Sequence, residues 1–80
     1  MNADDRTILA HIHDLVDEEK RLRAAHKGLD QQGRSRLQAI EAQLDQCWDL
    51  LRQRRAREET GDNPDTARER SVNEVESYLQ

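Results

Sequence analysis

The sequence has few of the residues from which small proteins build disulfide networks, base-stacking surfaces or membrane spans. Cysteine occurs once, as Cys47, so no disulfide can form within the chain, and a lone thiol is typical of a reducing compartment. Phenylalanine is absent, and the aromatic residues are Trp48 and Tyr78, too few for a row of rings that stacks on bases. No stretch approaches the roughly 20 apolar residues of a membrane-spanning helix, and the N-terminus lacks the apolar core of a signal peptide. We therefore expect a cytoplasmic protein with no membrane association.

Charged residues dominate what is present. The 13 Lys and Arg against 17 Asp and Glu leave a net charge of -4, which disfavours general binding to nucleic acid. With 34% hydrophobic residues in 80, the chain can form one domain, residues 1–80, whose core barely offsets the entropy lost on folding. Short chains without disulfides commonly gain stability from a metal or from association with another copy. We expect a homodimer.

Apolar residues repeat in two heptad patterns separated by a glycine-containing stretch. The first pattern contains Ile8, Ile12, Leu15, Leu22 and Leu29, with Glu19 and His26 filling the gaps. The second contains Leu37, Ile40, Leu44, Cys47 and Leu51, and continues through Arg54 and Glu58. Acids at the start of the first pattern and Gly28 at its end suit the two ends of a helix. We predict helices over residues 4–27 and 34–60, joined by a turn over residues 28–33.

The short link predicts an antiparallel, coiled-coil-like helical hairpin, in which facing residues have numbers that sum to about 62 to 64. This register places Leu22 against Ile40, Leu15 near Cys47 and Trp48, Ile12 against Leu51, and Ile8 beside Arg54 and Arg55. It also places Lys20 and Arg23 opposite Glu41 and Asp45, and Asp4 and Asp5 opposite Arg57. Trp48 is expected to be covered rather than open to solvent.

The C-terminal residues predict a turn and linker over residues 61–70 and a short helix over residues 71–79. Asn63 can cap a helical turn that has Pro64 at its first position. Ser71 and Glu74 form a capping-box pattern ahead of the apolar Val72 and Val75. A helix this short is unstable alone in water, so it must dock, either on its own hairpin or on another chain.

The apolar stripe is wider than a two-helix seam requires, because Leu9, Val16, Trp48 and Leu50 extend it. Either the C-terminal segment or the same face of a second protomer, which would complete a four-helix bundle, must cover these side chains. We predict an all-α protein whose self-association surface comprises Ile12, Leu15, Val16, Leu44, Trp48 and Leu51. The predicted function is a non-enzymatic protein–protein interaction module.

Candidate reactive and metal-binding residues are sparse. On a helix, His11 can share a ligand with Asp14 and His13 with Asp17, which gives two weak carboxylate–histidine pairs and no Glu-x-x-His motif. Cys47 occupies a seam position, where a thiol packs as a small apolar group and stays protonated. We expect no catalytic residues, no bound metal and no cofactor, although a metal site at His11 and His13 is a lesser alternative.

The basic run Arg52, Arg54, Arg55 and Arg57 supports an alternative function, a small nucleic-acid or ribosome-associated factor that contacts phosphate. The same run also has a structural explanation, since cations near a helix C-terminus offset its dipole and acids flank the run. Polar groups at the Glu19 and His26 seam positions could fix the register. For His26 we favour a seam that is open to water near the turn, and for Glu19 both interpretations stay open.

The second predicted helix contains the segment Leu44-Asp45-Gln46-Cys47-Trp48-Asp49-Leu50-Leu51-Arg52-Gln53-Arg54-Arg55-Ala56. Together with Asp17-Glu18-Glu19, Leu22-Arg23 and the terminal Tyr78-Leu79-Gln80, it resembles a family of short actinobacterial proteins classed as a domain of unknown function. The resemblance covers nearly the whole chain. It implies a stand-alone bacterial cytosolic protein and carries no activity, substrate or ligand.

Overall fold

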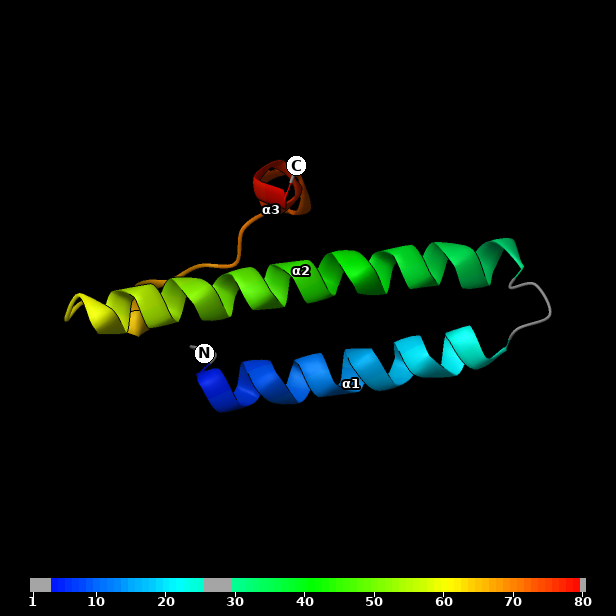
Figure 1. The fold of residues 1–80 in the computed structure, drawn as a ribbon, viewed down its shortest axis with the longest axis horizontal. Coiled ribbons are helices and arrows are strands. Elements are labelled where there is room, and N and C mark those ends of the chain that lie inside the picture. The colour runs from blue at the N-terminus through cyan, green and yellow to red at the C-terminus, as the bar shows by residue number, and fades with distance from the viewer. Residues whose placement is uncertain (1–3, 26–29, 80) are drawn as a thin grey trace.

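The computed structural model describes residues 4–25 and 30–79, with the backbone alone at 78 and 79. Its elements are α1 (Asp5–Ala24), α2 (Gln31–Glu59), the 3-10 helix η1 (Pro64–Thr66) and α3 (Val72–Leu79). Helices α1 and α2 lie side by side and run in opposite directions (Figure 1). The described residues contain no strand, which confirms the predicted all-α class and the antiparallel hairpin.

Helix α1 begins where the acidic residues predicted it would. Asp4 is the N-cap, and its carboxylate accepts a 2.8 Å hydrogen bond from the backbone amide of Thr7. This bond to the charged form lowers the pKa of Asp4 below its ordinary value. The helix ends at Ala24, three residues before the predicted boundary. His26, Gly28 and Leu29 lie outside the described residues.

Helix α2 begins earlier than predicted, so the expected turn over residues 28–33 is wrong for its last three positions. Asp30 is the N-cap, and its side chain accepts a 2.7 Å hydrogen bond from the amide of Gly33. Gln31 to Gly33 therefore form the first helical turn. The prediction treated residues 28–33 only as a turn, whereas an Asp three residues ahead of a free amide is also an N-cap.

Helix α2 ends in a Schellman motif centred on Gly61. The amide of Asp62 donates to the carbonyl of Arg57 at 2.7 Å, and the amide of Gly61 donates to the carbonyl of Glu58 at 3.2 Å. Gly61 has φ +81°, a left-handed conformation that glycine adopts without a steric cost. The helix therefore stops next to its predicted end at residue 60.

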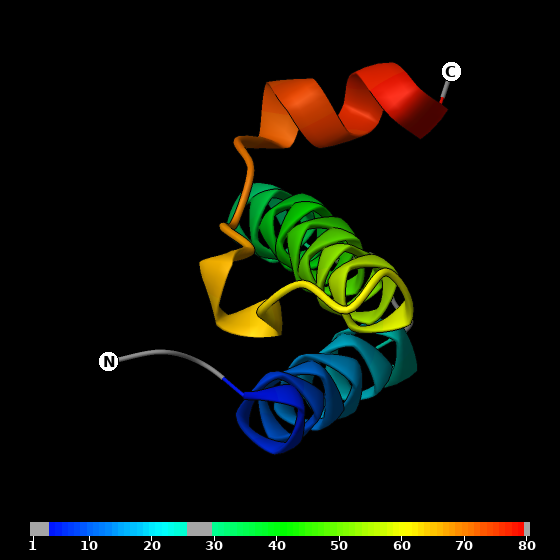
Figure 2. The same ribbon diagram turned by 90° about the vertical axis from the view of Figure 1, so that its left-hand side faces the viewer.

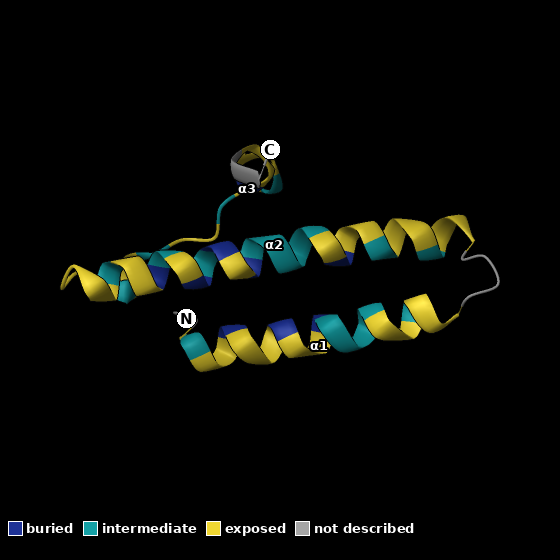
Figure 3. Cartoon of the chain, viewed as in Figure 1, coloured by how far each residue is buried: buried dark blue, intermediate teal, exposed yellow. Residues whose placement is uncertain are grey.

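The core lies between α1 and α2 and follows the two predicted seams. Its buried apolar members are Ile8, Ile12, Leu15, Ile40, Cys47 and Leu51, with Val16, Leu22, Leu44 and Leu50 packed against them. In Figure 3 buried residues lie along the sides of α1 and α2 that face each other, and α2 is also buried in part on its far side, toward α3. Within one chain, the expectation that Trp48 is covered is wrong, because its exposed fraction is 43%. Trp48 directly follows Cys47 and so lies about 100° further round the helix than the seam.

Residues 61–79, here termed the C-terminal arm, dock on the same chain's hairpin. Helix α2 lies between α1 and α3, and α3 runs across α2 rather than along it (Figure 2). Asn63 caps η1 through the amide of Asp65, and Ser71 caps α3 through the amide of Glu74, both as predicted. Val75 of α3 is buried, with 1% of its surface exposed. The arm therefore covers one side of α2 and leaves Trp48 uncovered.

None of the described helices combines the length and the apolar character needed to cross a bilayer.

Candidate interaction surface

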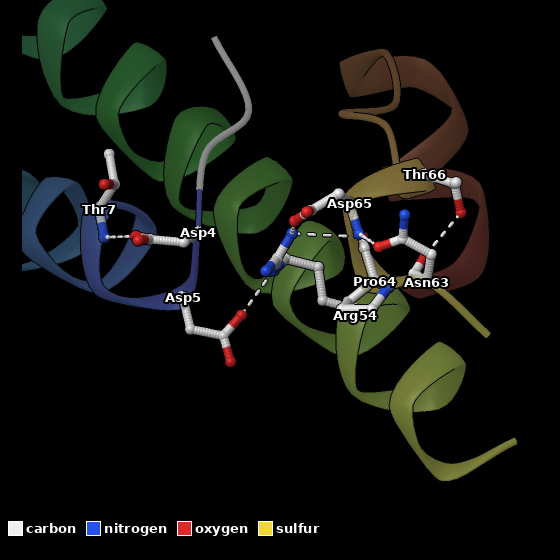
Figure 4. A network of polar contacts seen from close by, with 8 residues as sticks. All are labelled: Asp4, Asp5, Thr7, Arg54, Asn63, Pro64, Asp65 and Thr66. Carbon is white, nitrogen blue, oxygen red and sulfur yellow. Dashed lines mark hydrogen bonds and ion pairs between the residues drawn. The ribbon is translucent and has the colours of Figure 1, made fainter. Parts of the chain in front are cut away.

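Arg54 joins three parts of the chain through one buried guanidinium. Its Nε donates to the carboxylate of Asp5 at 2.6 Å, and its Nη1 donates to Asp65 at 3.0 Å and to the carbonyl of Pro64 at 3.2 Å (Figure 4). The side chain is only 7% exposed. The hydrogen bonds that Arg54 donates to Asp5 and Asp65 raise the pKa of Arg54 above its ordinary value. Arg54 thus ties the start of α1 and the start of the arm to α2.

This network corrects two predictions. Asp5 was expected opposite Arg57, but it pairs with Arg54, which lies on the buried side of α2 one turn earlier. Arg54 was also a candidate for phosphate contact, and its guanidinium is instead occupied by two carboxylates of its own chain. A solvent-exposed strip of four arginines is therefore not formed.

The other arginines of the run are divided between two environments. Arg52 and Arg55 are exposed, and neither pairs with an acid in the described part of the chain. Arg57 is half-buried, and its Nε is enclosed without a hydrogen-bond partner among the described residues. Two accessible guanidinium groups remain for any external contact.

Polar contacts hold the linker of the arm on α2. The side-chain amide of Gln46 donates to the carbonyl of Arg70 at 3.1 Å, and that of Gln53 donates to the carbonyl of Arg68 at 2.7 Å. Buried Asp49 accepts a 2.9 Å hydrogen bond from Gln53 and lies 3.7 Å from the guanidinium of Arg70. The two glutamines bind the linker backbone at alternate residues. The sequence pattern did not predict these contacts, because glutamines carry no periodic signal.

Cys47, His11 and His13 form no reactive arrangement with the described residues. Cys47 is buried in the seam as predicted, and this burial raises the pKa of its thiol, which keeps it protonated and inert. His13 lies 3.4 Å from Asp17 on the exposed surface of α1, and His11 is also exposed. Within residues 4–25 and 30–79, no group of three His, Cys, Asp or Glu side chains could hold a metal ion.

Besides the pair of Asp5 with Arg54, two ion pairs join α1 to α2 in the described part of the chain. Arg23 lies 2.7 Å from Glu41, as the predicted register required, while Lys20 and Asp45 form no ion pair within the described residues. On the other side of the hairpin, Glu18 pairs with Arg36 at 2.6 Å, which lowers the pKa of Glu18.

Glu19, whose role was left open, is partly covered and lies 3.6 Å from Arg23, so its charge has a partner on its own helix. This placement removes the need for a buried, unpaired carboxylate in the seam.

The ion pair of Arg23 with Glu41 marks the side of the hairpin on which apolar residues remain exposed. Val16 lies seven residues before Arg23 on α1, and Trp48 lies seven residues after Glu41 on α2. Seven residues return a helix almost to the same face. Because α1 and α2 are antiparallel, Val16 and Trp48 lie at the same level, on the side of the hairpin that carries the ion pair.

Leu9 lies seven residues before Val16 on α1, on the same side of the hairpin. The exposed fraction of Leu9 is 44%, which matches the 43% of Trp48. Leu44 lies one turn before Trp48 and, like Val16, is half-buried. We call the set Leu9, Val16, Leu44 and Trp48 the Trp48 flank.

The Trp48 flank differs from the predicted self-association surface. Ile12, Leu15 and Leu51 are buried between the helices of one chain and are not available to a second one. Leu9 was noted as widening the stripe but was left out of the predicted surface. Its spacing of seven from Val16 was the signal that could have included it.

These features define the class: an all-helical protein built on an antiparallel hairpin, with a C-terminal arm docked across its second helix. Residues 4–80 match the family described as "Protein of unknown function (DUF2630)", and the chain belongs to this family. It is similar to the uncharacterized protein Rv0898c of Mycobacterium tuberculosis, with 52% identity over 77 aligned residues that cover 92% of this chain and 88% of the relative. The uncharacterized protein Mb0922c of Mycobacterium bovis is similar to the same extent. No solved structure matches the chain.

Proposed function

We propose that this protein is a non-enzymatic helical interaction module that associates with a second copy of itself through the Trp48 flank. The observation that carries the proposal is the pair of large apolar side chains, Leu9 and Trp48, left exposed on one side of a chain with a small core. The arm covers a different side of α2, so no element in the described part of the chain closes over this flank. Exposed apolar groups that gather on one side of a helical pair are typical of a protein interface.

The area involved indicates a weak, concentration-dependent association. A tryptophan that is 43% exposed still shows roughly 100 Å² of surface, and covering it contributes about 2 to 3 kcal/mol at about 25 cal/mol per Å². Leu9 contributes somewhat less. At about 2 kcal/mol for each Leu9, two copies together would gain roughly 8 to 10 kcal/mol, against an association cost of about 4 to 15 kcal/mol. The balance depends on additional contacts, and the dimer should dissociate on dilution.

Sedimentation equilibrium over a roughly hundredfold concentration range tests the proposal. The wild-type protein is expected to shift from monomer to dimer, and Trp48→Ala should remain monomeric over the same range. His11→Ala, an exposed α1 substitution outside the flank, is the matched control and should behave as wild type. A wild-type protein that stays monomeric throughout, with a thermal midpoint that does not change with concentration, would refute the proposal.

The alternative of phosphate contact has less support. Of the four arginines in the run, Arg54 is buried in ion pairs and Arg57 is partly enclosed, which leaves Arg52 and Arg55. A gel-shift assay at low salt, where phosphate contacts are strongest, separates the two functions. Binding that is lost in an Arg52→Ala/Arg55→Ala variant would favour the phosphate function.

A further inference from the structure

We infer that two copies meet with their α2 helices antiparallel and with Trp48 at the two-fold axis. This inference rests on the proposed self-association and specifies its geometry.

The outer edge of α2 carries acids on one side of Trp48 and arginines on the other. Its members follow spacings of four and three, so they share one face of the helix: Glu41, Asp45, Trp48, Arg52 and Arg55. Glu41 and Arg55 lie seven residues to either side of Trp48. Asp45 and Arg52 lie three and four residues to either side. The edge is thus nearly symmetric about Trp48 in position and opposite in charge.

An edge of this kind is complementary to itself only when the second copy is reversed. An antiparallel pair centred on Trp48 places Asp45 against Arg52 of the second copy, and Glu41 against Arg55 of the second copy. The two-fold symmetry repeats both contacts, which gives four opposite-charge pairs around two packed tryptophans. A parallel pair would place each charge against its own kind.

The charges of this edge are available for such contacts. Asp45, Arg52 and Arg55 form no ion pair in the described part of the chain, and both arginines are exposed. Glu41 is exposed as well, although it already binds Arg23. The contact between Asp45 and Arg52 is therefore the main discriminating pair.

The arm does not obstruct this edge. It is gripped by Gln46 and Gln53, and Gln46 lies two residues before Trp48, which places the two side chains about 200° apart around the helix. Figure 2 shows η1 and the start of α3 on one side of α2, and the exposed fraction of Trp48 shows that its side remains open.

A second packing, in which α1 of one copy covers α2 of the other, uses the charges less fully. If the facing residues kept the register seen within one hairpin, this packing would place Lys20 against Asp45 and Arg23 against Glu41 of the second copy. The pair of Arg23 with Glu41 already forms within one chain. Arg52 and Arg55 would then face His13 and Leu9, without an acid. Pairing of α2 with α2 is the arrangement that gives both arginines a partner.

The test combines two single charge reversals, Asp45→Arg and Arg52→Glu. Each variant alone places like charges together twice across the two-fold axis, so the dissociation constant of its dimer should rise by about tenfold relative to wild type. An equimolar mixture pairs Arg at position 45 with Glu at position 52 in one contact and retains the wild-type pair in the other. The mixture should therefore regain wild-type affinity as a heterodimer, measured by sedimentation equilibrium or by exchange of a fluorescent label.

The controls are Asp14→Arg and Arg21→Glu, exposed charge reversals on α1 away from the flank, which should leave the affinity unchanged. Far-UV circular dichroism confirms that each variant is folded. A mixture that associates no better than either variant alone would overturn the antiparallel α2 pairing, as would Arg52→Glu that dimerises as tightly as wild type, the result expected from the α1-on-α2 packing. A monomeric wild-type protein would overturn the proposed function itself, so the two failures are distinguishable.

Discussion

Removing both acids that bind Arg54 should destabilise the protein more than removing Arg54. The guanidinium is 7% exposed, whereas the side chains of Asp5 and Asp65 are 39% and 46% exposed. The arginine therefore loses nearly all its hydration on folding, while the carboxylates keep about half of theirs. A charge left buried without a counter-ion costs more than two carboxylates that can return to water.

The expected magnitudes follow from this difference. Asp5→Ala and Asp65→Ala should each lower the free energy of unfolding by about 1 kcal/mol, because the remaining carboxylate still neutralises the guanidinium. The double variant should cost about 3 kcal/mol, which exceeds the sum, because only the carbonyl of Pro64 then accepts from Arg54. Arg54→Met should cost about 1 to 2 kcal/mol, since a flexible apolar side chain replaces the buried charge.

Urea unfolding followed by far-UV circular dichroism measures these values, at one fixed protein concentration because self-association would change the midpoint. Asp14→Ala, which removes an exposed acid of α1, is the control and should change the free energy by less than about 0.5 kcal/mol. A double variant no less stable than Arg54→Met would refute the reasoning that the buried guanidinium depends on its two carboxylates.

Three further predictions concern the ends of the helices and the arm. Gly61→Ala should lower the free energy of unfolding by about 1 kcal/mol, measured by urea unfolding, because φ +81° disfavours a side chain although no atom lies within 4 Å of the added Cβ. Folding lowers the pKa values of Asp4 and Glu18, so the stability that these groups contribute is present above their ordinary pKa values of 3.8 and 4.5 and is lost as pH falls through the lowered values. The urea midpoint should therefore decrease when the pH is lowered below about 4, and an Asp4→Asn/Glu18→Gln variant should show a smaller decrease. Val75→Ala removes the buried anchor of α3, so hydrogen exchange in residues 67–79 should accelerate by at least about tenfold while the amides of the α1–α2 seam stay protected; equal acceleration in both would contradict independent release of the arm.

The hairpin was predictable from the sequence because its information is periodic. Ile8, Ile12 and Leu15 repeat with the helix and must face one partner, and the short link leaves an antiparallel helix as that partner. The pair of Arg23 with Glu41 follows from the same register. Capping residues such as Asp4 and Ser71 were also predictable, since a single side chain satisfies a nearby amide.

Features that depend on contacts distant in sequence were not predictable. The partners of Arg54 come from residues 49 positions before it and 11 positions after it, and their meeting depends on how the arm turns back. Gln46 and Gln53 grip backbone carbonyls of the linker, which any residue type would supply. Trp48 was assigned to the shared strip because an apolar residue next to a seam position can point either way, and the side chain of Cys47 occupies the seam instead.

The central claim, that the exposed side of Trp48 is the surface at which two copies meet, is tested most directly by the fluorescence of Trp48 itself. The chain has one tryptophan, so its emission reports on this side chain alone. We predict that the emission maximum moves to shorter wavelength as the protein is concentrated, in step with the change in mass from 9.4 kDa to twice that value. An emission maximum that stays constant while the mass doubles would show that the copies meet elsewhere and would contradict the account.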